Sequence, residues 1–165
     1  MKIMIISDIH GGYEELKKVI DIYNAEGYER LFVLGDMYGG NSIDNNQIDN
    51  LLDSIKDKVM VRGNCDIFLT RLIDRYKTRI DGNRIVLVHN RNLAQGCNAD
   101  IVFYGHTHIP SIMFENGTCY VNPGSIAKSR EGENSFGTLD NDNICIKSID
   151  NKVLKIGTIG NIKKA

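Results

Sequence analysis

All four histidines of this 165-residue chain stand in short polar segments, beside aspartate, asparagine or glycine. The most suggestive segment is "YGHTH" (104–108), because two imidazoles at positions i and i+2 are costly to leave without partners. Four other segments, "SDIHG", "LGD", "RGNCD" and "LVHN", add further nitrogen and oxygen donors. Together they supply seven candidate metal ligands: Asp8, His10, Asp36, Asn64, His89, His106 and His108.

These donors suit a pair of divalent ions. Two histidines and two aspartates would satisfy one ion, while a shared aspartate, an asparagine carbonyl and two histidines would satisfy the second. One bridging carboxylate allows two cations to lie about 3.5–4 Å apart, a spacing at which they can clamp a phosphoryl group and an attacking hydroxide. Mixed nitrogen and oxygen donors favour Mn²⁺, Fe, Zn²⁺ or Ni²⁺ over Ca²⁺.

Each segment also has a purely structural interpretation. Asp8 is a plausible helix cap, "GD" and "GNCD" are common in turns, and His89 at the end of an apolar strand is typical of a core histidine. The histidine pair could belong to a hydrogen-bonded loop. The occurrence of all five segments at successive strand ends favours the metal site over these separate explanations.

The apolar pattern predicts where these strands lie. Helices are expected over 13–25 and 46–56 and a short one near 66–75, with strands at 2–7, 30–36, 58–64, 85–89, 101–104, 112–115, 118–122, 136–139, 143–149 and 152–159. The apolar spacing predicts an inward face for each of the first two helices: Leu16, Val19, Ile20 and Tyr23 in one, and Ile48, Leu51, Leu52 and Ile55 in the other. The β-α-β-α-β start indicates parallel pairing, and the later strands with short turns indicate antiparallel pairing. We therefore expect an α/β (α+β) fold in a single domain, residues 1–165, with two packed sheets flanked by helices. Sites form at the carboxyl ends of strands in such folds.

Composition excludes several classes of protein. A net charge of −1 and a pI near 6.4 give no strong nucleic-acid signal and no attraction to an anionic membrane. No apolar run reaches the ~20 residues of a membrane span, and the four cysteines show no C-x-x-C pair, so we expect a cytoplasmic protein with reduced thiols. Whether the chain forms a homo-oligomer is left open.

In order along the chain, "SDIHG", "LGD", "RGNCD", "LVHN", "GHTHIP" and "VNPGS" resemble the calcineurin-like metallophosphoesterases, and among them the YfcE-like phosphodiesterase group. The resemblance implies a four-layer αββα sandwich and a dinuclear metal centre. It implies that Asp8, His10, Asp36 and His108 bind the first metal and that Asp36, Asn64, His89 and His106 bind the second, with Asp36 as the bridge. Asp66, which follows Asn64 closely, is a candidate to orient a ligand or to hold the start of a helix.

The chain departs from the wider superfamily at two positions. Many members have a histidine at the position of Cys65, where it protonates the leaving group or steadies the phosphate. The YfcE-like members resemble this chain in having a cysteine there. A thiol is a poor substitute for imidazolium at neutral pH. Asn90 and Arg91 follow His89 where the family commonly reads H-G-H, so Arg91 is a candidate for phosphate binding. The 122–125 turn is implied to lie against the site, which makes Asn122, Ser125, Lys128 and Arg130 further substrate candidates.

The expected activity is hydrolysis of a small phosphoester, most readily a phosphodiester, by a hydroxide that bridges two metal ions, with Mn²⁺ favoured. Asp36, Asn64, Cys65 and His89 are the expected catalytic positions. Two alternatives remain: a non-catalytic metal-binding scaffold of the same fold, and a nucleotide phosphomonoesterase. The second would be expected to carry a capping domain or a basic groove, for which 165 residues leave no space.

Overall fold

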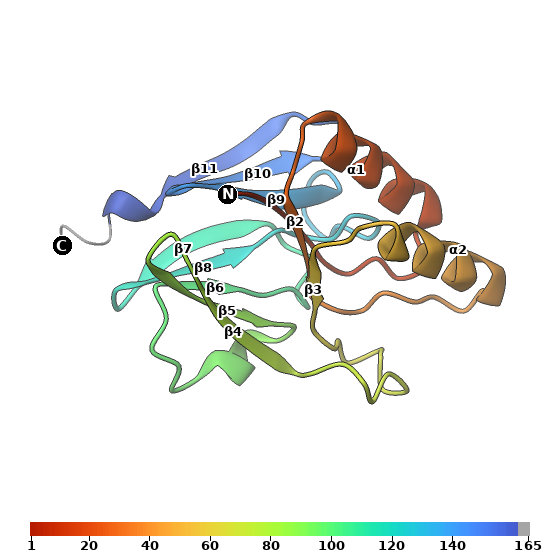
Figure 1. Cartoon of the computed structure of the whole chain (residues 1–165), viewed down its shortest axis with the longest axis horizontal. Helices are drawn as coiled ribbons and strands as arrows, with labels where there is room; N and C mark the ends of the chain where they lie inside the picture. The colour runs from red at the N-terminus through yellow and green to blue at the C-terminus, as the bar shows by residue number, and fades with distance from the viewer. Residues whose placement is uncertain (162–165) are drawn as a thin grey trace.

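Two β-sheets pack face to face in the computed structural model, which describes residues 1–161, and two α-helices cover one outer face (Figure 1). Residues 162–165 of the predicted domain lie outside the described residues. Both sheets are mixed, as predicted. Neither α-helix within residues 1–161 has the length and apolar character needed to span a lipid bilayer.

The first sheet contains the predicted β-α-β-α-β unit. Its order is β11-β10-β9-β1-β2-β3, formed by β1 (Lys2–Ile6), β2 (Arg30–Val33), β3 (Lys58–Met60), β9 (Ser135–Asp140), β10 (Asn143–Ser148) and β11 (Val153–Thr158). Strands β1, β2 and β3 run parallel, joined by α1 (Tyr13–Ala25) and α2 (Ser42–Asp53). Strands β9, β10 and β11 continue the sheet from β1 in antiparallel pairs.

The second sheet has the order β4-β5-β6-β8-β7, formed by β4 (Arg75–Ile80), β5 (Asn83–Val88), β6 (Ile101–Phe103), β7 (Ser111–Glu115) and β8 (Thr118–Asn122). Its three inner strands are parallel, and antiparallel hairpins form both edges. Strand β5 ends immediately before His89, and β6 ends just before "YGHTH". The parallel arrangement therefore brings these two segments to the same edge of the sheet.

Strand β1 shows how one short sequence serves two cores. Met4 and Ile6 pack under the helices, whereas Ile3 and Ile5 face the second sheet. All four are fully buried, because a parallel strand inside this sandwich is covered on both faces. Between the two sheets, the ring centroids of Phe32 and Phe103 lie 6.2 Å apart.

The four-layer arrangement is confirmed with one difference in its outer layer. The predicted apolar face of α1, which comprises Leu16, Val19, Ile20 and Tyr23, is buried against the first sheet. The outer face of the second sheet is covered by the 3₁₀ turn η1 (Arg91–Ala94) and the loop beyond it, where Ala94 and Ala99 pack on the sheet. The outer layer on the second sheet was expected to be helical, and in the described residues it consists of a 3₁₀ turn and a loop.

The predicted helix over 66–75 is wrong. The segment forms a series of turns, and β4 begins at Arg75. Asp66 explains the difference, because its carboxylate accepts backbone N–H groups from Asp36 at 2.6 Å, Met37 at 3.0 Å and Gly63 at 2.9 Å. These bonds fold the chain back onto the loop after β2, which leaves Ile67 and Phe68 exposed while Leu69 and Leu72 pack against the core from the turns.

The second helix is displaced toward the N-terminus relative to the expected range of 46–56. It begins at Ser42 because Asn41 caps it, with Oδ1 accepting the Ile43 N–H at 2.9 Å. It ends at Asp53, and Ile48 and Leu52 carry its buried face as predicted. Of the other two residues predicted to face inward, Leu51 is only partly buried, and Ile55 is buried but lies beyond the end of the helix.

We expect Asp66→Asn to lower the free energy of unfolding by about 1–3 kcal/mol, because an amide NH₂ would replace one of the oxygens that accept backbone N–H groups. Asp21→Asn, the same substitution at an exposed position, should change it by less than about 0.5 kcal/mol. Urea unfolding of the metal-stripped proteins measures both values. Equal stability of the two variants would contradict the role assigned to Asp66.

Candidate metal centre

The seven candidate ligands lie in loops that hydrogen bonds hold together at one edge of the two sheets. Three backbone bonds join these loops in pairs: Asp8 N–H to Gly35 O at 3.0 Å, His10 N–H to Asp36 O at 2.9 Å, and Gly105 N–H to His89 O at 2.9 Å. A side-chain bond joins the sheets, since Asp8 Oδ2 accepts the His106 N–H at 3.0 Å. The loops after β1, β2, β5 and β6 therefore form one structural unit.

Five of the seven candidate ligands have a left-handed backbone conformation. Their φ angles are 54° at Asp8, 44° at His10, 54° at Asp36, 69° at His106 and 60° at His108. Within residues 1–161, the other non-glycine residues with positive φ are four Asp or Asn residues in hairpin turns. Backbone strain of order 1–3 kcal/mol per residue persists where the surroundings impose it, and it is concentrated at functional sites.

Two glycines in the signature segments are required by close approach. A Cβ at Gly63 would lie 2.1 Å from Asp36 Oδ1 and 2.2 Å from Asp36 N. A Cβ at Gly105 would lie 2.0 Å from Ser7 Oγ and 2.7 Å from Asp8 Oδ2. Neither position has space for a side chain, because backbone there packs directly against the two carboxylates.

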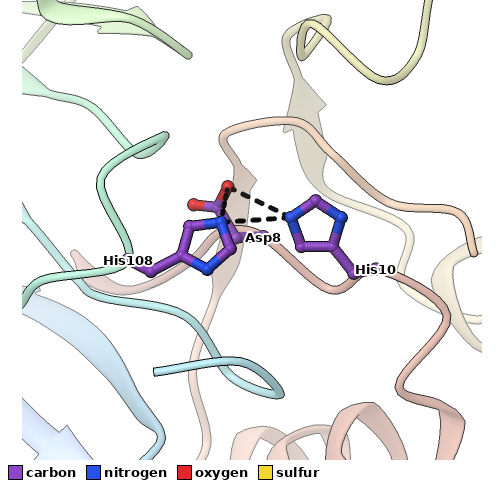
Figure 2. A group of neighbouring side chains, drawn as sticks. All are labelled: Asp8, His10 and His108. Atoms are coloured by element: carbon purple, nitrogen blue, oxygen red, sulfur yellow. Dashed lines mark hydrogen bonds and ion pairs between the residues drawn. The ribbon is translucent and has the colours of Figure 1, made fainter. Parts of the chain in front are cut away.

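One group of donors consists of Asp8, His10 and His108, whose side chains point toward one another from two separate loops (Figure 2). His108 donates from Nδ1 to the Lys128 carbonyl at 2.7 Å, so a neutral ring presents its lone pair at Nε2. That atom lies 3.1 Å from His10 Nε2 and 3.2 Å from Asp8 Oδ1. Three electron-rich atoms thus converge.

The Asp8 carboxylate is fully buried and only half of it is hydrogen-bonded. Oδ2 accepts from Ser7 Oγ at 2.7 Å and from the His106 N–H, whereas Oδ1 accepts no hydrogen bond. A buried carboxylate oxygen without a partner is costly. Oδ1 is the oxygen that faces the two imidazoles, at the position where a cation would satisfy it.

A second group consists of Asp36, Asn64, His89 and His106. His89 donates from Nδ1 to the Leu34 carbonyl at 2.7 Å, which directs Nε2 toward Asn64 Oδ1 at 2.9 Å and Asp36 Oδ2 at 3.3 Å. His106 Nδ1 lies 2.9 Å from the same Asn64 oxygen, and the two imidazole centroids are 5.2 Å apart. Both rings are close enough to reach one ion.

Asp36 lies between the two groups. Its Oδ2 is 3.7 Å from His10 Nε2 and 3.3 Å from His89 Nε2, and Oδ1 accepts the Cys65 N–H at 2.7 Å. Burial alone would raise the pKa of Asp36, but hydrogen bonds from His89 and Cys65 outweigh burial and lower the pKa to about 2. Burial favours the neutral His89 ring, yet Asp36 holds the pKa of His89 above its ordinary value. Asp36 is therefore a stable anion within reach of both groups.

Two residues expected to touch substrate instead support the ligand loops. Asn122 is buried and donates from Nδ2 to Gly105 O at 2.8 Å and to Thr107 Oγ1 at 2.9 Å. Ser125 is buried and donates from Oγ to Asp8 O at 2.7 Å. Their polar groups hold the loops that carry Asp8 and the histidine pair, and they are not exposed to a substrate.

The basic candidates differ from one another. Arg91 does not face the donors, because its guanidinium pairs with Glu115 and lies 3.9 Å from the centroid of the Tyr120 ring. Lys128 and Arg130 are exposed, and their backbone atoms contact His108: Lys128 O accepts from its ring, and Arg130 N–H donates to its carbonyl at 3.1 Å. A phosphate contact by Lys128 or Arg130 stays a prediction, and Arg91 is already paired elsewhere.

Cys65 lies at the exposed side of the donors. Its Sγ falls within 4.8 Å of ligand atoms of His10 and Asp36. Burial, followed by the negative charge of Asp36, raises the pKa of the Cys65 thiol. Both effects favour the neutral thiol over the thiolate in the metal-free protein.

Sequence reasoning missed the groups that orient the histidines. The backbone carbonyl of Leu34 orients His89, and that of Lys128 orients His108. A backbone carbonyl leaves no signal in the sequence. Ser7 was also missed, although it adjoins Asp8 in "SDIHG" and its hydroxyl donates to that carboxylate. A hydroxyl directly before a candidate ligand was the one available signal.

The arrangement fits divalent ions. Imidazole nitrogens, carboxylate oxygens and an amide oxygen face one another at 2.9–3.7 Å, an arrangement that needs a proton or a cation between the atoms. Within the described chain, no lysine or arginine pairs with Asp8 or Asp36. Oxygen and imidazole donors together are those that first-row divalent metals prefer.

Known proteins are similar to this chain over most of its length. Residues 1–143 match the family model for the calcineurin-like phosphoesterase superfamily domain. Phosphodiesterase YfcE of Escherichia coli K12 is 27% identical over an alignment covering 92% of this chain and 94% of YfcE. Phosphodiesterase MJ0936 of Methanocaldococcus jannaschii is 26% identical, with 86% and 94% covered.

Solved structures agree with these matches. The Escherichia coli phosphoesterase Yfce superposes with a TM-score of 0.81 at 26% identity, covering 96% of this chain and 100% of that chain. Vps29 of Entamoeba histolytica, solved with zinc, superposes with a TM-score of 0.73 at 21% identity, covering 96% and 99%, a likeness that shows the fold alone. Since the family model matches most of the sequence, this protein belongs to the calcineurin-like phosphoesterase superfamily.

Proposed function

We propose that the protein is a metal-dependent phosphodiesterase with two divalent ions at its centre. The first ion would be bound by Asp8, His10, Asp36 and His108, and the second by Asp36, Asn64, His89 and His106. Asp36 would bridge the two, in keeping with its distances of 3.7 Å and 3.3 Å to His10 and His89.

The unpartnered Asp8 Oδ1 is the observation that carries this proposal. It is a buried carboxylate oxygen, and its neighbours are His108 Nε2 at 3.2 Å and His10 Nε2 at 3.7 Å. Removing such a carboxylate from water is unfavourable unless a counter-charge satisfies it. A divalent cation supplies that charge and at the same time resolves the contact between His10 and His108.

When bound, the two ions would lower the pKa of a coordinated water and neutralise charge on the phosphate. The residues of this chain hold the arrangement in place: carbonyls fix the tautomers of His89 and His108, and Asp66 fixes the turn that carries Asp36. Cys65 lies beside this arrangement, and a thiol is a weaker proton donor to a leaving oxygen than an imidazolium.

Phosphodiesters are the favoured substrates because of this weak acid and because YfcE and MJ0936 are named phosphodiesterases. An acidic alcohol or phenol is a good leaving group, so it departs from the diester without strong protonation. Mn²⁺ is the favoured ion, since carboxylate and amide oxygens suit it, and imidazole also accommodates Fe, Zn²⁺ or Ni²⁺.

The non-catalytic alternative draws on a different surface. Val153, Leu154 and Ile156 on the edge strand β11 are exposed, and exposed apolar edges are typical of protein contacts. The complete donor set nevertheless favours the enzyme, because a scaffold has no need of strained backbone at five ligand positions.

Replacing Asp36 by Asn should lower phosphodiester turnover more than replacing Asn64 by Ala, because the carboxylate neutralises both ions and the amide contacts one. We expect loss of bound metal to accompany loss of rate in each variant. Elemental analysis beside hydrolysis of bis(p-nitrophenyl) phosphate measures both. An Asp36→Asn protein that keeps two ions and a near-native rate would refute the bridge.

Replacing Cys65 by His should increase the hydrolysis of diesters with poor leaving groups more than that of diesters with good ones, because imidazolium is the stronger proton donor. Rates across aryl and alkyl diesters of graded leaving-group pKa, for both proteins, test this. Parallel dependences would show that Cys65 takes no part in leaving-group departure. If both proteins bind two ions and hydrolyse no ester, the scaffold alternative is correct.

A further inference from the structure

A pocket of about 430 Å³ adjoins the proposed metal centre. Asn64 and His89 form part of its wall, so the pocket is continuous with the second group of donors. Beyond them it is lined by Ile67, Leu93 and Asn90, among others. Its volume lies within the range typical of small-molecule sites.

Two apolar side chains lining the pocket are left uncovered by the fold. Ile67 is 63% exposed and lies in the turns after the "RGNCD" loop, and Leu93 is 43% exposed and belongs to η1. They come from different segments of the chain and line the same space. Burying them under a ligand would remove apolar surface from water, which favours binding of an apolar group.

The pocket offers no unpaired charge for a second anionic group. Among the residues that the structure describes, Arg62 is the one lysine or arginine lining the pocket, and Asp74 engages its guanidinium at 2.9 Å and 2.7 Å. Arg91, the neighbour of Asn90 in sequence, pairs with Glu115 outside the pocket. A substrate with further phosphates would find no counter-charge here.

Asn90 adds a neutral polar group to the wall. Its Oδ1 accepts the Asn92 N–H at 3.0 Å and caps η1. This bond fixes the orientation of the amide and therefore of its Nδ2 group. The pocket is therefore apolar, electrically neutral and supplied with an amide. These properties select against charged ester groups and for neutral ones.

We propose that this pocket binds a neutral, mainly apolar organic group of the substrate, about the size of one aromatic ring, while the phosphate lies at the metal centre. Ile67 and Leu93 would be the residues that determine this preference. The inference rests on the proposed function and specifies its substrate class: phosphodiesters that carry at least one hydrophobic ester group, as distinct from nucleotides with additional phosphates.

Phosphonates provide the test, because each carries one organic group on an unreactive P–C bond. Titration calorimetry of the Mn²⁺-reconstituted protein should show phenylphosphonate binding about tenfold more tightly than methylphosphonate. Ile67→Asn and Leu93→Asn should each reduce that ratio to about threefold or less and leave methylphosphonate affinity within about twofold. Ile43→Asn is the matched control: the same substitution at a residue that is 68% exposed and does not line the pocket should leave the ratio unchanged.

The outcomes separate the two proposals. Equal affinities for both phosphonates in the native protein, or a ratio that neither variant alters, would overturn the pocket assignment and leave the metal centre standing. If neither phosphonate binds to protein that holds two ions, the proposed function fails and the pocket assignment with it. A preference for phenylphosphonate that both variants reduce and the control preserves supports the pocket assignment.

Discussion

Two buried carboxylates that no described lysine or arginine pairs with impose the constraint on which the rest of this structure depends. Asp8 and Asp36 lie at the edge of the sandwich, and imidazole nitrogens rather than lysines or arginines approach both in the described residues. Burying anions in this way is unfavourable unless compensating charge is present. This edge of the fold is therefore locally unstable until protons or cations compensate the two carboxylates.

The surrounding structure is organised to hold that arrangement. Left-handed backbone at the ligand positions turns each side chain inward, and Asp66, Asn122 and Ser125 use their buried polar groups to hold those turns. The residues next to the candidate ligands thus hold the backbone of the loops, and the candidate ligands point their side chains toward one another. Close approach at Gly63 and Gly105 leaves the loops little space to rearrange.

Much of this was predictable because strand ends have a clear sequence pattern. Apolar runs followed by Asp, Asn or His located the seven donors, and the spacing of Leu16, Val19, Ile20 and Tyr23 located α1. The turns after Asp66 were not predictable, because a carboxylate bonding to distant backbone N–H groups overrides local helical preference. The role of Arg91 depended on Glu115 and Tyr120, whose proximity only the tertiary fold creates.

The central claim is that this edge of the fold binds two divalent ions, and a metal titration of the stripped protein tests it most directly. Calorimetry with Mn²⁺, followed by thermal unfolding of the same samples, gives stoichiometry and linked stability together. The account predicts two ions per chain and a melting temperature that rises with Mn²⁺ concentration, since ions that bind only the folded state stabilise it. No saturable binding and an unchanged melting temperature would contradict it.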